Sequence, residues 1–406
     1  MKKWGEIALG IATSVGGFLD VGSIATSAQA GAKFRFQLLW AVALGTLCLI
    51  FLTEMSGRLA AVSRHTVTDA VRERFGATVF MVILVGVGLS SLLVLGAEIG
   101  GTALALQLAT GINFKWWAIP VAIAVWLFLW RATFGVIDNG VALLSLITLA
   151  FVVAIFRLHA PGGEMARGLL PTLPGDDRAQ FGFLAVSILG ASLTPYLFYF
   201  YSSGAVEDKW DESYIGVNRV VSAVGMTFGG AIAAAVLIVA ALVFAPHGIQ
   251  VDRYEQAGLM LTDAFGKWGF PLFVGSLFIA CFGSALEVAL TLAYMCAQGL
   301  GWNWSEDQRP RDDARFSAVY TLAIAVSTIV VVIGIDPLKV TNIAMALSAA
   351  TLPLLVVPFL VVMNDERYLK DHTNGWFDNG VVIAITTLAF ALAVVAIPLE
   401  LMGGGS

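Results

Sequence analysis

The chain has 406 residues, of which 58% are hydrophobic and 13% charged, and its mean hydropathy is +0.85. This composition excludes an ordinary soluble domain, and the long apolar runs predict membrane-spanning helices rather than the short alternating segments of a membrane barrel. The formal charge of −5 is small for this length, and the basic residues are scattered between apolar runs, so we expect no nucleic-acid partner.

Hydropathy and the positions of Gly and Pro predict an all-α integral membrane protein of about eleven helices. The first run is interpreted as a retained helix, because it lacks a small-residue cleavage site and Asp20 interrupts it. We expect one membrane domain over 1–402 and interpret the terminal GGGS at 403–406 as a linker. The predicted spans are 5–30, 36–57, 77–109, 115–131, 137–157, 180–204, 216–246, 268–300, 315–335, 338–363 and 378–400.

The basic residues predict the orientation of these helices. Most of the 23 Lys and Arg residues fall in segments that share one side of the membrane with the N-terminus. Since cytoplasmic loops carry the excess of Lys and Arg, we expect a multi-pass protein of the cell inner (plasma) membrane with the N-terminus in the cytoplasm and the C-terminus outside.

The first and sixth spans share a pattern. "FLDVGSIATSAQAGAKF" and "SLTPYLFYFYSSGAVEDKW" each place a polar residue at a weak backbone point, followed by small residues and a Lys with an aromatic residue. These spans open two five-helix units, at about 5–157 and 180–363, and an odd number of helices inverts the second unit relative to the first. The pattern resembles the LeuT-type transporters, which implies that helices 1 and 6 are broken and that helix 11 at 378–400 lies outside the repeats.

Five acids lie within or at the edge of the apolar spans, and each costs about 2.5–3.5 kcal/mol at a helix centre unless it faces protein, water or a ligand. Glu54 and Asp138 lie near membrane edges, where we expect pairing with a buried Arg or capping of a helix. The other three are Asp20, Glu98 and Glu287.

Asp20 has the most informative surroundings. It lies among glycines that tolerate unwinding, and Pro195 in the sixth span removes a backbone donor. Two facing breaks would place free carbonyl oxygens beside a carboxylate, which is a site for a hard cation. The alternative is a Gly and Pro kink with a hydrogen-bonded Asp.

Four segments together resemble the NRAMP family of divalent-metal transporters: "DVGSIATSAQAGAKFRFQLLW", "EMSGRLAAVSRHTVTDAVRERFG", "GAEIGGTALALQLATGI" and "GSALEVALTLAYMCAQGLGW". The family's helix 1 motif is DPGN, and this chain has DVGS at the same place. The resemblance therefore implies that Asp20, Ser23 and the carbonyl of Gly17 line the ion site.

In helix 6 the family motif A-x-x-M-P-H corresponds to "ASLTPY". The resemblance assigns the carbonyl donor to Ala191, places Thr194 where the family has Met, and places Tyr196 and Tyr201 where it has two His residues. In helix 3 the family has two acids, and this chain has Leu95 at the first of these positions and Glu98 at the second. Glu98 and Glu287 are then candidates along the aqueous route, and Asn342 and Ser348 in helix 10 are polar candidates without a spacing argument.

This chain has Thr194 where the family has Met, so it lacks a soft ligand that favours transition metals. It also lacks both His residues of the family, which are groups that carry protons near neutral pH. This combination is similar to the NRAMP-related magnesium transporter branch. It implies a secondary carrier for Mg²⁺, and also Mn²⁺, uncoupled from protons. Alternatives are a proton-coupled Mn²⁺ carrier and an organic-solute symporter of the same fold. We expect no enzymatic activity, because no phosphate loop or nucleophile motif is present. We also expect a monomer in the lipid bilayer, without a cofactor.

Overall fold

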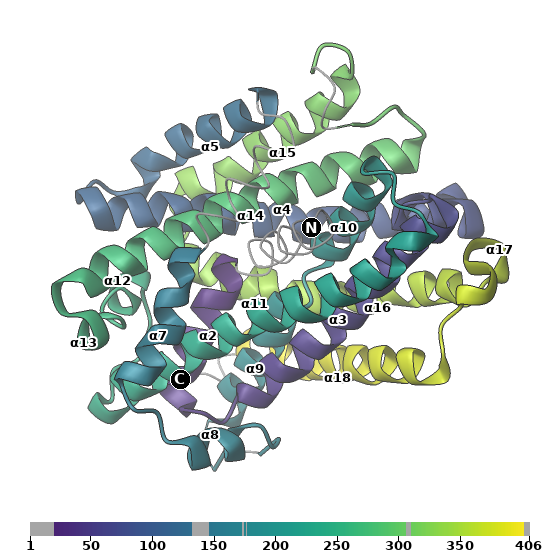
Figure 1. The fold of residues 1–406 in the computed structure, drawn as a ribbon. Coiled ribbons are helices and arrows are strands. Elements are labelled where there is room, and N and C mark those ends of the chain that lie inside the picture. Colours follow the sequence, from purple (N-terminus) through teal and green to yellow (C-terminus); the bar gives the residue numbers. More distant parts are fainter. Residues whose placement is uncertain (1–19, 132–145, 173, 176, 306–309, 402–406) are drawn as a thin grey trace.

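The structure is a computed structural model that describes residues 20–131, 146–172, 174–175, 177–305 and 310–401 (Figure 1). Within these ranges the chain is helical and forms no strand. Four short helices lie in connections: α8 (Gly162–Gly168), α12 (Tyr254–Ala257), α13 (Thr262–Phe265) and α17 (Glu366–Leu369). The longer helices are α2 (Val21–Phe34), α3 (Leu39–Ser63), α4 (Val67–Thr110), α5 (Phe114–Arg131), α7 (Leu149–Arg157), α9 (Arg178–Ser192), α10 (Pro195–Glu207), α11 (Ile215–Val243), α14 (Gly269–Leu300), α15 (Ala314–Ile333), α16 (Pro337–Met363) and α18 (Trp376–Leu401).

The helix bounds follow the predicted apolar runs to within a few residues at most ends. Nine spans in the described ranges are long and apolar enough to cross a membrane, with α9 and α10 together counted as one. The predicted spans 5–30 and 137–157 are described only from residues 20 and 146 onward, and Asp138 lies outside the described residues. The early start of α4 is explained by Gly76, whose φ of 83° separates residues 67–75 from the span predicted at 77–109.

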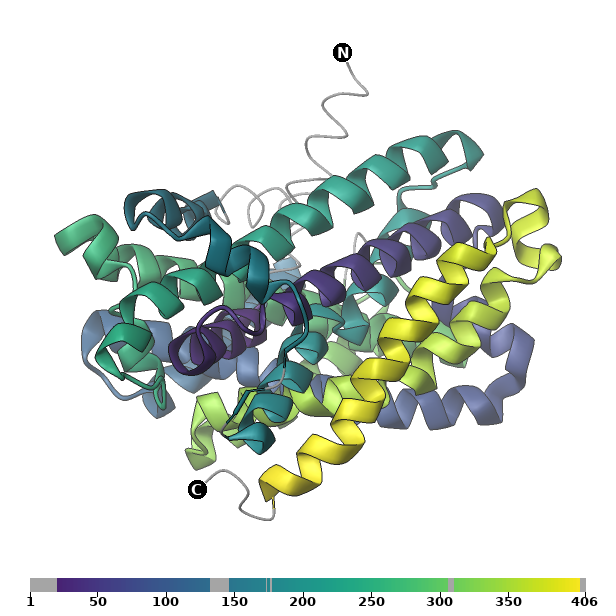
Figure 2. The same cartoon turned by 90° about the horizontal axis from the view of Figure 1, so that it is seen from below.

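The helices form two packed groups. One contains α2, α3, α9 and α11, the other contains α4, α5, α14 and α15, and α10 packs on α3 of the first group and on α14 of the second. The two views show α5 and α15 on one side of the molecule and α18 on the other (Figures 1 and 2). Helix α16 joins the groups because it packs on α4 of one group and on α9 of the other, and it also packs on α18.

Close backbone contact sets the distance between α9 and α16. A methyl group on Gly190 would lie 1.9 Å from the carbonyl oxygen of Met345, so no other residue fits at position 190 without a shift of the backbone. This contact lies one residue before Ala191. The packing of α16 therefore holds the end of α9 close to the position at which helix 6 breaks.

Outside the membrane spans, α17 is tied to the start of α4. The carboxylate of Asp365 lies 3.0 Å from Arg74 Nε and 2.5 Å from an Arg367 nitrogen. The hydrogen bond from the Arg367 side chain lowers the pKa of Asp365 to about 2. This ion pair joins the α16–α18 connection to the segment before Gly76.

Candidate functional site

The first candidate element is the start of α2 at Asp20. Asp20 has extended backbone angles (φ −113°, ψ 177°) and is the N-cap of α2, because its Oδ1 accepts the Ser23 N–H at 2.6 Å. The Ser23 hydroxyl also hydrogen-bonds the Asp20 carboxylate. A carboxylate in this position is stabilised by the N-terminal end of the helix dipole. The helix therefore does not continue through Asp20, while Gly17 lies outside the described residues.

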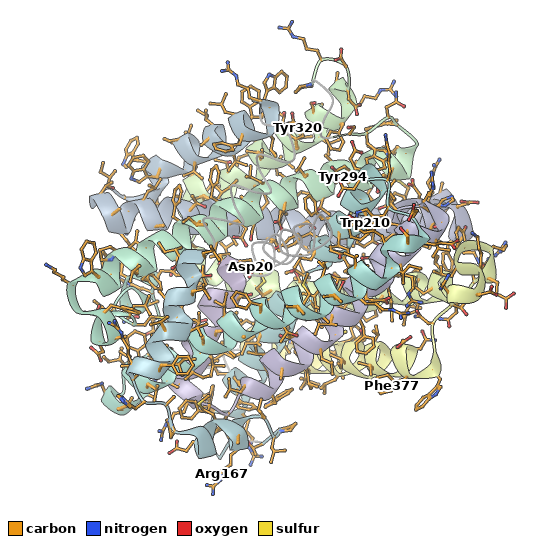
Figure 3. The ribbon with its side chains drawn as sticks, in the orientation of Figure 1. Asp20, Arg167, Trp210, Tyr294, Tyr320 and Phe377 are labelled. Carbon is orange, nitrogen blue, oxygen red and sulfur yellow. The ribbon has the colours of Figure 1, made fainter. Side chains whose placement is uncertain are left out.

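The second oxygen of Asp20 has a different environment. The side chain is completely buried, near the middle of the molecule (Figure 3), and Oδ2 has no hydrogen-bond partner among the described residues. A buried carboxylate oxygen is costly unless water, a donor or an ion satisfies it. Asp20 therefore offers one oxygen fixed by the helix and one oxygen open to a ligand.

The second candidate element is the break in helix 6, which lies where the sequence predicts it. Helix α9 ends at Ser192 and α10 begins at Pro195. In a continuous helix the carbonyl of Ala191 would accept the N–H of residue 195, but proline has none. The Thr194 hydroxyl lies 3.4 Å from this carbonyl, which is long for an O–H···O bond. Ala191 and Thr194 are both buried, so the break presents a carbonyl and a hydroxyl inside the protein.

Tyr196 follows the break in helix 6 and lies near the acidic residues. Its side chain is buried, its hydroxyl hydrogen-bonds Ser284 on α14, and it lies within electrostatic reach of Asp20, Glu98 and Glu287. The structure thus brings together two predicted site residues, Asp20 and Tyr196, and the two predicted pathway acids. Sequence reasoning missed Ser284, because no motif marks a serine on a helix far along the chain.

Glu98 has a role that the sequence did not reveal. It lies on α4, is completely buried, and accepts the N–H of Val21 at 3.3 Å and 3.2 Å with its two carboxylate oxygens. The thiol of Cys281 on α14 also hydrogen-bonds Glu98. Glu98 therefore accepts a hydrogen bond from the first turn of α2 and links α2 to α4 and α14.

A sulfur atom also lies close to the start of α2. A methyl group on Gly22 would lie 2.4 Å from Sδ of Met345, a buried residue of α16. The missing side chain at position 22 makes room for the thioether between the broken helices. The two polar candidates on this helix are Asn342 and Ser348. Asn342 Oδ1 and Ser348 Oγ are both buried and have no hydrogen-bond partner among the described residues.

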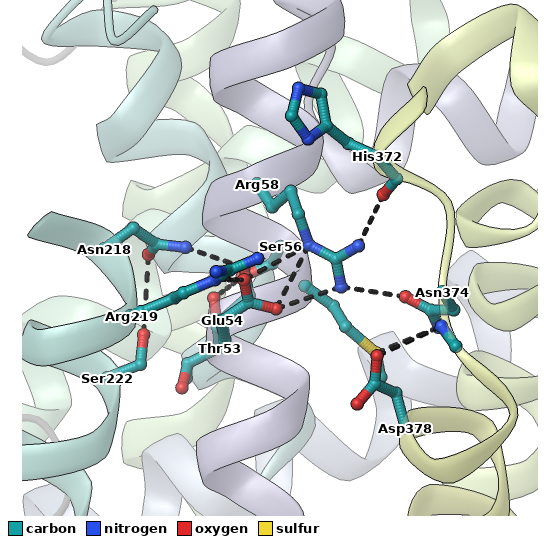
Figure 4. A network of polar contacts seen from close by, with 12 residues as sticks. Thr53, Glu54, Ser56, Arg58, Asn218, Arg219, Ser222, His372, Asn374 and Asp378 are labelled. Atoms are coloured by element: carbon teal, nitrogen blue, oxygen red, sulfur yellow. Dashed lines mark hydrogen bonds and ion pairs between the residues drawn. The ribbon is translucent and has the colours of Figure 1, made fainter. Parts of the chain in front are cut away.

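Tyr201 lies in a separate polar network, which is drawn in part in Figure 4. Its hydroxyl donates to Asn218 Oδ1 on α11 at 2.9 Å, and its ring packs edge-on against Trp210. Glu54 on α3 is a carboxylate close enough to act on it electrostatically. Tyr201 is therefore engaged between α3, α10 and α11, and the structure does not place it with Asp20.

The described part of the chain contains no group of three His, Cys, Asp or Glu side chains arranged to hold a metal ion. The three cysteines are free, with Cys48 and Cys281 buried and Cys296 partly buried. A cation between the two breaks would be bound by one carboxylate together with carbonyl and hydroxyl oxygens, which are the ligands of hard cations.

Comparison with known proteins identifies the family. The Nramp family, described as natural resistance-associated macrophage protein-like, matches residues 10–398. The chain belongs to this family. Two curated Nramp relatives are named divalent metal cation transporter MntH. The protein of Klebsiella pneumoniae subsp. pneumoniae is 25% identical over 393 residues, covering 93% of this chain and 90% of its own. That of Yersinia enterocolitica is 26% identical over 374 residues, covering 88% and 86%.

Solved structures show that this Nramp chain has the LeuT-type fold. A manganese transporter of Eremococcus coleocola superposes with a TM-score of 0.77 at 19% identity, over 98% of this chain and 87% of that one. The nucleobase-cation-symport-1 family transporter Mhp1 superposes with a TM-score of 0.62 at 15% identity, over 98% and 93%. The predicted LeuT-type architecture is therefore confirmed, with helix 6 broken at Leu193–Thr194 and α2 starting after Asp20.

Proposed function

We propose that this Nramp protein is a secondary transporter that moves a divalent cation across the inner membrane by alternating access. The observation that carries the proposal is the buried Oδ2 of Asp20 at the start of α2, which has no hydrogen-bond partner among the described residues. A bound cation would satisfy this oxygen, and discontinuous helices near the midplane are where such carriers bind ions. The names of the curated relatives support a divalent metal as the substrate.

The chemistry of helix 6 supports Mg²⁺ as the preferred ion, with Mn²⁺ also carried. The proposed ligands are oxygen atoms: the Asp20 carboxylate, the Ala191 carbonyl, and the Thr194 hydroxyl at the place of the family's Met. Mg²⁺ retains several waters and uses one or two carboxylates, which fits a site with a single anionic ligand. Ser23, Gly17 and Tyr196 complete the proposed surroundings of the ion.

The same residues support transport with little or no proton movement. Tyr196 and Tyr201 stand where the family has two His residues, and Leu95 replaces the first acid of helix 3. None of these side chains exchanges a proton near neutral pH. A proton-coupled Mn²⁺ carrier is the competing function, and the uptake experiment below distinguishes the two. We further propose a monomer with a cytoplasmic N-terminus.

Uptake into proteoliposomes tests the proposal. Mg²⁺ and Mn²⁺ uptake are measured under a clamped membrane potential while a trapped dye reports the internal pH. We expect uptake of both ions without acidification. The variant Asp20→Asn, which removes the charge and retains the shape of the side chain, should take up neither Mg²⁺ nor Mn²⁺. Asp263→Asn in the exposed α13 is the matched control and should transport normally.

Three results would contradict parts of this proposal. Normal uptake by folded Asp20→Asn would remove Asp20 from the site. Acidification at a fixed ratio to Mn²⁺ would establish the proton-coupled carrier instead. Uptake of Mn²⁺ that Mg²⁺ in excess does not reduce would refute the assignment of Mg²⁺.

A further inference from the structure

A cavity of about 350 Å³ lies beside the second half of α3. Its volume is within the range of small-molecule sites in proteins. Side chains of α3, α11, α18 and the connection before α18 line it: Ile50, Phe51, Glu54, Arg58, Arg219, Asp371, His372, Thr373 and Asp378. Transport as proposed above uses none of these residues.

Two of the lining charges neutralise each other. Arg58 is buried and donates to both carboxylate oxygens of Glu54, with distances of 3.0 to 3.2 Å. Its other contacts are the His372 carbonyl at 2.5 Å and Asn374 Oδ1 at 2.9 Å (Figure 4). This confirms the expectation that Glu54 pairs with a buried Arg. Four of the five N–H groups of the Arg58 guanidinium are therefore engaged within the protein, and its charge is paired with Glu54.

The remaining charges have both signs and are open. Arg219 is 65% exposed and lies with Nε 3.5 Å from Glu54 Oε1, and no hydrogen bond from its two terminal nitrogens is recorded among the described residues. Asp378 accepts the Gly375 N–H at 3.1 Å, and Asp371 is exposed. No Lys or Arg among the described residues pairs with either aspartate. The cavity therefore presents one guanidinium and two carboxylates to an occupant.

One side of the cavity is apolar and meets the membrane boundary. Ile50 and Phe51 belong to α3, and the Phe51 ring contacts Phe377 at the start of α18, with 6.0 Å between centroids. Trp376 and Phe377 are 87% and 55% exposed, and Phe377 lies at the edge of the molecule (Figure 3). Aromatic residues at the end of a membrane helix mark the headgroup level, so the charged side of the cavity lies beside lipid headgroups.

We propose that this cavity binds the headgroup of an aminophospholipid, a lipid with a phosphate and a primary ammonium group such as phosphatidylethanolamine. The phosphate pairs with the terminal nitrogens of Arg219, and the ammonium donates to Asp371 and Asp378. The acyl chains leave past Phe51 and Phe377 into the bilayer. Arginine suits phosphate because its planar fork donates two hydrogen bonds, and the ammonium supplies three donors to the carboxylates.

The charge pattern distinguishes this lipid from others. An anionic lipid without an amine would place its phosphate near two carboxylates and offer them no cation. A choline headgroup carries the cation but has no N–H to donate to Asp371 or Asp378. An aminophospholipid matches both signs of charge and also supplies N–H donors to the carboxylates.

Competitive lipid binding tests the proposal. The purified full-length protein is exchanged into micelles that contain equal amounts of phosphatidylethanolamine, phosphatidylcholine and phosphatidylglycerol, and the bound lipids are counted by native mass spectrometry. We expect phosphatidylethanolamine to be retained about tenfold more than the other two, as the loss of charge-assisted hydrogen bonds predicts. Equal retention of the three lipids, or preference for phosphatidylglycerol, would overturn the proposal.

Variants separate the two halves of the headgroup. Arg219→Gln should lower the binding of phosphatidylethanolamine and phosphatidylcholine alike. Asp371→Asn with Asp378→Asn should abolish only the preference between them, while the amide oxygen introduced at position 378 still accepts the Gly375 N–H. Arg167→Gln on the exposed α8, at the far edge in Figure 3, is the control and should bind as the wild type does.

Two further outcomes count against the proposal. If the ethanolamine preference survives in the double aspartate variant, the ammonium is not bound at these carboxylates. If soluble phosphoethanolamine displaces the lipid at equal concentration, the site serves a water-soluble ligand and not a lipid. Thermal unfolding of each variant confirms that it is folded before binding is compared.

Discussion

Substitution of Arg58 by Met removes the centre of the polar network that joins α3 to the connection before α18. The Arg58 side chain is 6% exposed and contacts Glu54, the His372 carbonyl and Asn374. Met has a similar length and no charge, so it fills most of the space. The expected loss of stability therefore comes from the polar groups that lose their partner.

The magnitude follows from the groups that remain. Removing one partner of a buried ion pair destabilises a protein by about 3–5 kcal/mol, because the other charge stays buried. Glu54 is 17% exposed and retains Arg219 at 3.5 Å, so we expect the lower end of this range, about 3 kcal/mol. At about 2 °C per kcal/mol for a large domain, the melting temperature should fall by about 6 °C.

Thermal unfolding in detergent, followed by tryptophan fluorescence, measures this change. The double variant Glu54→Gln/Arg58→Met should be more stable than Arg58→Met alone, because it contains no uncompensated carboxylate. Arg167→Met, an exposed arginine on α8, should leave the melting temperature unchanged. An unchanged melting temperature in Arg58→Met, or a double variant less stable than the single one, would refute the assignment of a buried pair.

Three further predictions concern the two helix breaks. Thr194→Met should shift competition between Mg²⁺ and Cd²⁺ toward Cd²⁺ in uptake under one potential, because sulfur is a soft ligand; an unchanged ratio with high uptake would mean that residue 194 does not face the ion. Gly190→Ala should lower the melting temperature, since the methyl group would lie 1.9 Å from a backbone oxygen of Met345, and a stable variant would show that α16 moves freely. Glu98→Ala should slow uptake by freeing the start of α2, whereas Glu98→Gln keeps an acceptor for the Val21 N–H and should be less affected; equal loss in both would indicate that charge and not capping matters.

The membrane helices could be predicted because each is a long apolar run, and Gly, Pro or polar residues close in the sequence mark its ends. The break in helix 6 was also predictable, since Pro195 removes a donor wherever the helix packs. The pairing of Glu54 with Arg58 joins residues four apart, which lie on one face of a helix. These features depend on short stretches of sequence.

Other features depend on residues far apart in the chain. The bond from Val21 to Glu98 spans 77 positions, and that from Arg58 to Asn374 spans 316. Nothing in the sequence near Tyr201 shows that its hydroxyl points toward Asn218 instead of Asp20. Such contacts arise from the packing of whole helices, so they could be known only once the fold was determined.

The N-cap at Asp20 has a consequence for which ions the protein can hold. Its Oδ1 accepts the Ser23 N–H at 2.6 Å, so a cation bound through both carboxylate oxygens would share Oδ1 with this N–H and weaken the cap of α2. A small octahedral ion that accepts a single oxygen and keeps its waters avoids this cost, whereas Ca²⁺, which often takes a carboxylate through both oxygens, does not. The first turn of the helix would thereby discriminate between ions by the number of Asp20 oxygens that each ion uses. An ion that used both oxygens would loosen the start of the helix that holds it.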